Sequence, residues 1–76
     1  MSHLNHLLGL FTGLDETIES LDKLREKLVA VKAEFKADSQ EHWEFNKMFL
    51  ETSAVMFMLK DMRKDMRIKI SEEEKK

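Results

Sequence analysis

The sequence predicts an all-α protein built as an antiparallel helical hairpin. Three observations favour this fold. The 76-residue chain contains no proline and only two glycines, so little in it interrupts a helix. Its leucine, lysine, glutamate and methionine residues are good helix formers. Leucines recur at every seventh position in the first half, the spacing that aligns side chains along one face of a helix.

The N-terminal segment is rich in leucine but contains Gly9 and Gly13. Each glycine costs a helix interior about 1 kcal/mol relative to alanine. We therefore expect a separate short helix or helical turn over residues 3–11. Residues 1–13 contain no lysine or arginine, which is atypical of a helix that lies on a membrane surface, so no membrane partner is expected.

The first long helix is predicted over residues 14–36. One row of side chains repeats at every seventh position, and a companion row follows three residues later. The first row is Leu7, Leu14, Leu21, Leu28 and Phe35, and the second is Leu10, Thr17, Leu24 and Val31. Two such rows form the seam along which helices pack in a coiled coil. We expect this seam to face the second helix.

A helix break is predicted near Asp38. Asp38 and Glu41 have the spacing of a capping box, in which two side chains satisfy the free N–H groups at a helix start. Ser39 is a competing N-cap. No glycine marks the break, so a single uninterrupted helix through Ala37 is the alternative.

The second helix is predicted over residues 40–69, followed by a flexible charged tail over 71–76. Its apolar residues cover two faces. The broad face, expected to pack on the first helix, comprises Phe45, Met48, Phe49, Val55, Met56, Leu59, Met62, Met66 and Ile70. At about 100° per residue, a second group points nearly the opposite way. This group is Trp43, Leu50, Ala54, Phe57 and Met58.

The distribution of charge favours the antiparallel arrangement. A turn near residue 38 places an acidic stretch beside a basic one. The acids are Asp15, Glu16, Glu19 and Asp22, and the bases are Lys60, Arg63, Lys64, Arg67 and Lys69. Each exposed pair contributes only about 0.2–1 kcal/mol, but together they disfavour a parallel arrangement.

The second apolar face predicts a protein interface. A chain of this length buries only about 60% of the surface that it exposes when unfolded, and small domains commonly need disulfides, a metal or a partner chain. Cysteine is absent, so disulfides are excluded. Exposed apolar patches usually mark contacts. We therefore predict an interface formed by Trp43, Leu50, Ala54, Phe57 and Met58, which joins two copies into a four-helix bundle. A heterologous protein helix is the other expected partner.

No catalytic site, cofactor or metal is expected. His3 and His6 stand three residues apart, but they lack the further ligands and supporting carboxylates of a zinc site. Glu41, His42 and Glu44 are close in sequence, yet a hairpin of two helices offers no pocket that excludes water. The sequence therefore favours a non-enzymatic adaptor, assembly factor or regulator.

Nucleic-acid binding is the alternative function. Arg63, Lys64, Arg67 and Lys69 form a basic end of the second helix that could follow phosphates. However, 13 basic and 15 acidic residues give a formal net charge of -2, so the overall field does not attract nucleic acid.

Residues 1–76 are expected to form one small domain in the cytoplasm. The longest unbroken apolar run, 54–59, is far shorter than the about 20 residues of a membrane span. The absence of cysteine is compatible with a reducing compartment.

Overall fold

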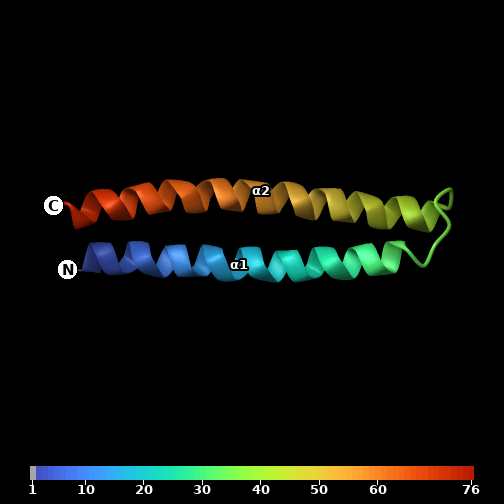
Figure 1. The fold of residues 1–76 in the computed structure, drawn as a ribbon, viewed down its shortest axis with the longest axis horizontal. Helices are drawn as coiled ribbons and strands as arrows, with labels where there is room; N and C mark the ends of the chain where they lie inside the picture. The colour runs from blue at the N-terminus through green and yellow to red at the C-terminus, as the bar shows by residue number, and fades with distance from the viewer. Residues whose placement is uncertain (1) are drawn as a thin grey trace.

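The computed structural model describes residues 2–76 as two long antiparallel helices joined by a short turn (Figure 1). Helix α1 spans Ser2–Lys32 and helix α2 spans Gln40–Glu74. They lie side by side in a rod whose Cα atoms extend over 57 × 14 × 12 Å, with both termini at one end and the turn at the other. The predicted all-α helical hairpin is confirmed.

The first helix is continuous through both glycines. The separate short helix expected over residues 3–11 is instead the first part of α1. Neither glycine adopts a positive φ, and a Cβ added at either one would meet nothing within 4 Å. Local propensity is outweighed here because Leu4, Leu7 and Phe11 are half-buried in the hairpin, and such packing supplies most helical stability in proteins.

The turn covers residues 33–39, so α1 ends before the predicted residue 36 and the uninterrupted helix is excluded. The N–H groups of Glu34 and Phe35 donate to carbonyls three residues back, over 3.0 and 3.2 Å, which tightens the end of α1. The Phe35 ring then stacks on Phe45 of α2, with centroids 5.7 Å apart. This stacking closes the hairpin at the turn.

The second helix begins with Ser39 as its N-cap. The backbone of Ser39 is extended, and its Oγ accepts a hydrogen bond from the His42 N–H over 3.2 Å. The competing cap is therefore used in place of the Asp38–Glu41 capping box. The His42 ring turns back toward α1, where its Nδ1 lies 3.1 Å from the carbonyl oxygen of Lys32.

The second helix extends further toward the C-terminus than predicted. Helix α2 extends to Glu74, beyond the predicted end at residue 69, and includes most of the 71–76 segment that was expected to be a flexible tail. Near its end, Lys76 Nζ donates a hydrogen bond to Glu73 Oε1 over 3.0 Å. This bond lowers the pKa of the Glu73 carboxyl.

The core is a narrow seam between the helices. Among residues 3–76, the buried side chains are Leu14, Ile18 and Met56. Half-buried apolar side chains extend the seam in both directions. On the α1 side they include Leu4, Leu7, Phe11, Leu21, Leu28 and Phe35, and on α2 they are Phe45, Phe49, Leu59, Met66 and Ile70. The predicted row from Leu7 to Phe35 therefore does face α2.

The companion row differs from the prediction. Leu10, Thr17 and Leu24 are exposed and Val31 is half-buried, whereas the seam is occupied by the residues one position later: Phe11, Ile18, Arg25 and Lys32. Likewise Met48, Val55 and Met62, expected on the packing face of α2, are exposed at its margin. A seam between two helices is narrow, because only positions spaced alternately three and four residues apart reach it.

Candidate protein-docking surfaces

One long side of the rod carries charges that match across the two helices. Asp15 and Asp22 each follow a seam residue of α1, Lys60 follows a seam residue of α2, and all three line one groove together with Arg63. Arg63 donates a hydrogen bond to Asp15 and forms an ion pair with it. We call Asp15, Asp22, Lys60 and Arg63 the charged side. In this part of the rod, the predicted juxtaposition of acids and bases is confirmed.

Two further contacts between the helices show which residues of each helix lie on the charged side. Lys32 Nζ donates to Asn46 Oδ1 over 3.0 Å, and the Arg67 guanidinium lies 5.5 Å from the centroid of the Phe11 ring. Each contact joins a seam residue of α1 to a residue that follows the seam on α2. The rows that follow the seam on both helices therefore share the charged side.

The opposite side is lined by two rows of residues. On α1 the row lies one position before Ile18, Arg25 and Lys32, and on α2 it lies one position before Phe49, Met56 and Arg63. At about 100° per residue, both rows point away from the charged side. They contribute Leu10, Leu24 and Val31 from α1 and Met48, Val55 and Met62 from α2. We call these six residues the apolar side. All except the half-buried Val31 are between 43% and 51% exposed. The same two rows also contain Thr17 on α1 and Lys69 on α2. Apolar side chains from both helices thus face solvent along most of this side.

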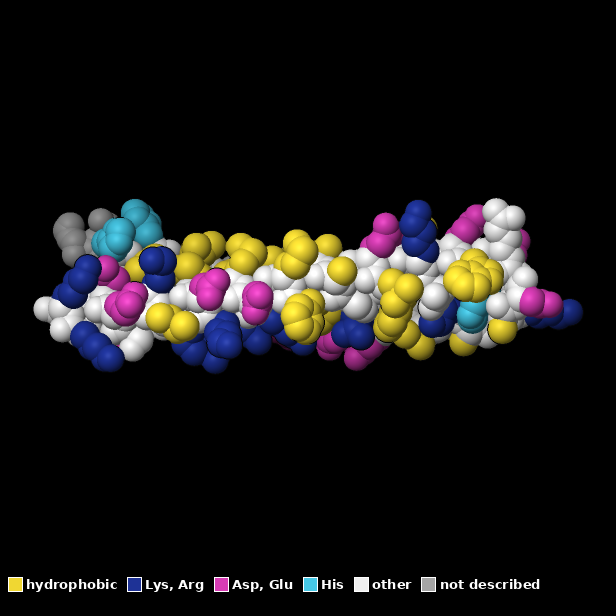
Figure 2. Space-filling model, turned by 90° about the horizontal axis from the view of Figure 1, so that it is seen from above, with side chains coloured by type: hydrophobic (Ala, Val, Ile, Leu, Met, Phe, Trp, Pro, Cys, Tyr) yellow, Lys and Arg dark blue, Asp and Glu magenta, His cyan; other side chains and the backbone are white. Residues whose placement is uncertain are grey.

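The predicted interface lies on the outer surface of α2. Phe57 is 75% exposed, Trp43 65%, Met58 62% and Leu50 57%, and Ala54 is also exposed. We call these five residues the outer stripe. Figure 2 looks onto this surface of α2 and shows apolar side chains along the rod, interspersed with charged ones. Their exposure is as expected, while their role as an interface stays a prediction.

The outer stripe includes an open hollow near the turn. Trp43 and Leu50 line it together with Gln40, Glu44 and Lys47. The remaining exposed large apolar side chains are more scattered: Leu8 and Val29 lie toward the two ends of the charged side, and Ile68 lies near the C-terminal end of α2.

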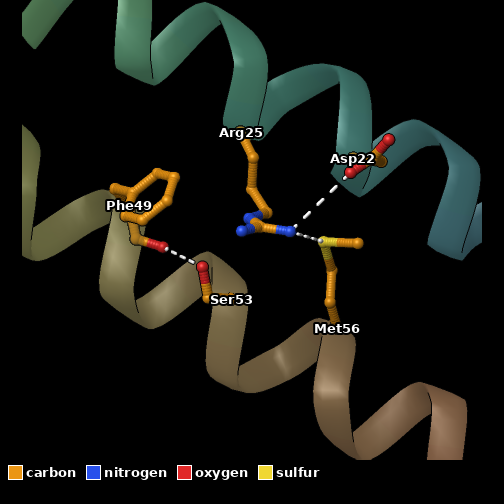
Figure 3. A network of polar contacts seen from close by, with 5 residues as sticks. All are labelled: Asp22, Arg25, Phe49, Ser53 and Met56. Atoms are coloured by element: carbon orange, nitrogen blue, oxygen red, sulfur yellow. Dashed lines mark hydrogen bonds and ion pairs between the residues drawn. The ribbon is translucent and has the colours of Figure 1, made fainter.

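A polar cluster interrupts the seam at Arg25. The Arg25 guanidinium extends from α1 toward α2 between Phe49 and Met56 (Figure 3), 5.0 Å from the Phe49 ring centroid. Its Nη1 lies 3.7 Å from both Met56 Sδ and Asp22 Oδ1. Its Nε is buried and has no hydrogen-bond partner within the described part of the chain. Lys32 Nζ approaches the same Phe49 ring at 4.9 Å.

Sequence reasoning missed this cluster because it followed the apolar residues. A count of alternating three-residue and four-residue steps from Leu14 would have placed Arg25 in the seam. A single polar residue at such a position commonly fixes the register and the orientation of paired helices.

Three of the basic residues of the nucleic-acid alternative are neighbours on α2: Arg63, Lys64 and Arg67. Arg63 is half-buried and pairs with Asp15, while Arg67 is exposed and lies against the Phe11 ring. Lys64 and Lys69 are exposed, but Lys69 follows Met62 by one heptad and so lies apart from the other three. The basic side chains are therefore partly used in contacts with α1.

Comparisons with protein families, curated proteins and solved structures found no match to this chain. Within residues 2–76, no helix has a stretch long and apolar enough to cross a membrane. No group of three or more His, Asp and Glu side chains in this part of the chain is arranged to hold a metal ion. Function is therefore inferred from the surfaces of the hairpin.

Proposed function

We propose that this chain is a non-enzymatic helical interaction protein that acts by helix–helix docking and self-association, as an adaptor, assembly factor or regulator. One observation carries the proposal: α2 exposes large apolar side chains in two directions, on the outer stripe and on the apolar side. A helix that is apolar in several directions is normally covered from several directions. Within this chain, α1 covers the seam of α2 and leaves the other two surfaces exposed.

The exposed area supports a partner of substantial size. The chain exposes 5969 Å². A compact monomer of its 9.0 kDa mass exposes about 4,900 Å². The excess of about 1,100 Å² is larger than the about 800 Å² that each partner buries in a standard interface. The proposal therefore includes a homodimer of hairpins in a four-helix bundle, which covers this kind of excess.

Electrostatics favour docking over nucleic-acid binding. Arg63 and Arg67 pack against α1, and the chain carries more acidic than basic residues. The cytoplasmic location expected from the sequence is part of the proposal, as is the expectation that no cofactor is required.

Photo-cross-linking from the outer stripe tests the proposal. The photoreactive amino acid p-benzoylphenylalanine replaces Phe57 in one variant and Glu16, an exposed residue of α1, in a matched control. Irradiation of cells that make the protein should give a discrete adduct from position 57, either with a second copy or with another protein, and none from position 16. The absence of a discrete adduct from position 57 would contradict the proposed docking role.

A further inference from the structure

We propose that the apolar side, rather than the outer stripe, receives the second copy of this chain, in a two-fold arrangement that sets α1 of each copy on α2 of the other. The inference rests on the proposed function, because it names the surface used for self-association. It leaves Trp43, Leu50 and Phe57 of the outer stripe open to a heterologous helix.

The first argument is that both helices contribute to the apolar side. Leu24 and Val31 come from α1, and Met48 and Val55 come from α2. Two hairpins stacked through this side bring four helices around one core, as a four-helix bundle requires. Stacking through the outer stripe would join only the two α2 helices. The apolar side would then stay in water and would add no hydrophobic stabilisation to the dimer.

The second argument is that the aromatic part of the outer stripe points away from the apolar side. Phe57 and Val55 are two residues apart, which is about 200° around a helix and thus about 160° by the shorter way. Met58 lies between these two rows, one turn from both Val55 and Met62, so it borders the apolar side. A helix docked on the apolar side can reach Met58 but leaves Phe57 uncovered.

The pairing of α1 with α2 within one chain fixes which residues lie at the same height along the rod. Asp15 meets Arg63, and Lys32 meets Asn46. A two-fold axis parallel to the rod keeps these levels and exchanges the helices, so that α1 of one copy runs antiparallel over α2 of the other. By the same register, Lys27 of one copy lies level with Glu51 of its partner.

The third argument is charge complementarity at that level. Lys27 and Glu51 are exposed and border the apolar side, each one turn beyond a member of it, Leu24 and Met48 respectively. Within a single chain they lie on opposite edges, and neither forms an ion pair within residues 2–76. Stacking forms the Lys27–Glu51 pair twice, once on each edge. The other two-fold stacking, α1 on α1, separates these two charges.

Small residues on the same edge of α1 permit close approach. Ser20 and Gly13 of one copy lie level with Met58 and Asp65 of the other, by the register given above. A Cβ at Gly13 would meet nothing within 4 Å, so this edge presents open space to the partner helix. No like-charged side chains face each other at these levels.

Charge reversal tests the arrangement without disturbing the seam. Sedimentation equilibrium at low salt compares the native chain with Lys27→Glu, Glu51→Lys and the double variant, and circular dichroism confirms that each is helical. We expect a native dimer, about tenfold weaker dimerisation in each single variant, and recovery to within about threefold of the native constant in the double variant. Single reversals without effect, or a double variant that adds the two losses, would overturn the proposed pairing.

A second pair of variants separates the two surfaces. Leu24→Glu on the apolar side should give a monomer, whereas Phe57→Glu on the outer stripe should leave the dimer intact. The opposite result would place the second copy on the outer stripe and overturn the inference while leaving the proposed function in place. A native chain that is monomeric at every concentration would also overturn it, and cross-linking from position 57 then decides independently whether the outer stripe docks a partner.

Discussion

The two long sides of the hairpin flank the same seam but carry opposite kinds of side chain. On the charged side, Asp15 of α1 pairs with Arg63 of α2, and both side chains remain partly exposed. On the apolar side, Leu24 is 44% exposed and Val55 43%. The centre of the charged side is paired within one chain, and its exposed apolar side chains, Leu8 and Val29, lie toward its ends. The apolar side gains free energy only when another surface covers it.

A protein of two helices must pair them in one register and must also bury enough apolar surface. The charged side opposes parallel or shifted pairing of α1 and α2, because those arrangements would separate acids from bases. In the proposed assembly, the apolar side and the outer stripe supply the further burial that a small hairpin lacks on its own. Substitutions in the seam should affect both sides, whereas substitutions on one side should affect that side alone.

The largest expected effect is that of Met56→Ala. Met56 is 3% exposed at the centre of the seam, so its truncation leaves a cavity beneath both sides. We expect the free energy of unfolding to fall by about 2–5 kcal/mol, which is a large share of the stability of a domain this small. Urea unfolding followed by far-UV circular dichroism measures it, with Glu16→Ala as an exposed control. A loss comparable to that of the control would mean that the seam is not the core.

An intermediate effect is expected for Arg25→Met. The change removes a buried Nε that lacks a hydrogen-bond partner and fills the same space with an apolar side chain. Such replacements are commonly neutral or stabilising, so the free energy of unfolding should stay the same or rise by about 1–2 kcal/mol. Thermal unfolding should be compared with that of Lys23→Met, an exposed control. A fall of more than about 1 kcal/mol relative to this control would show that the contacts with Asp22 and Phe49 outweigh the cost of desolvation.

The smallest effect is expected on the charged side. A double-mutant cycle with Asp15→Asn and Arg63→Gln should give a coupling energy of about 0.5–1 kcal/mol, because both side chains are partly exposed. Added salt should weaken this coupling. Association through the apolar side should persist at high salt, since burial of apolar surface is not screened. A coupling above about 2 kcal/mol that ignores salt would show that the charged side is a buried network.

Much of the fold follows from local signals in the sequence. The row of Leu14, Leu21 and Leu28 predicted the seam, and the start of α2 at residue 40 was expected from polar residues that favour N-caps. The continuity of α1 through Gly9 was not predicted. Helix propensity describes an isolated segment, whereas packing against the far end of α2 stabilises this one.

The docking surfaces were predicted in part. The outer stripe is exposed as its angle around α2 implied, but the apolar side was mistaken for seam. Two rows of α1 repeat every seven residues, and the row with Leu24 is more apolar than the row with Arg25 and Lys32. Hydrophobicity therefore selected the wrong row. The geometry of paired helices, in which seam positions alternate by three and four residues, selects the right one.

Cross-linking between single cysteines shows which helices of two copies lie side by side. The chain has no cysteine, so Lys27→Cys and Glu51→Cys each introduce a unique thiol. The two variants are mixed and treated with a short bismaleimide, and the products are identified by mass. A predominant 27-to-51 product between copies is expected, because the two-fold stacking sets these positions at one level on adjacent helices. Predominant 27-to-27 or 51-to-51 products, or no dimeric product, would contradict the proposed stacking of α1 on α2.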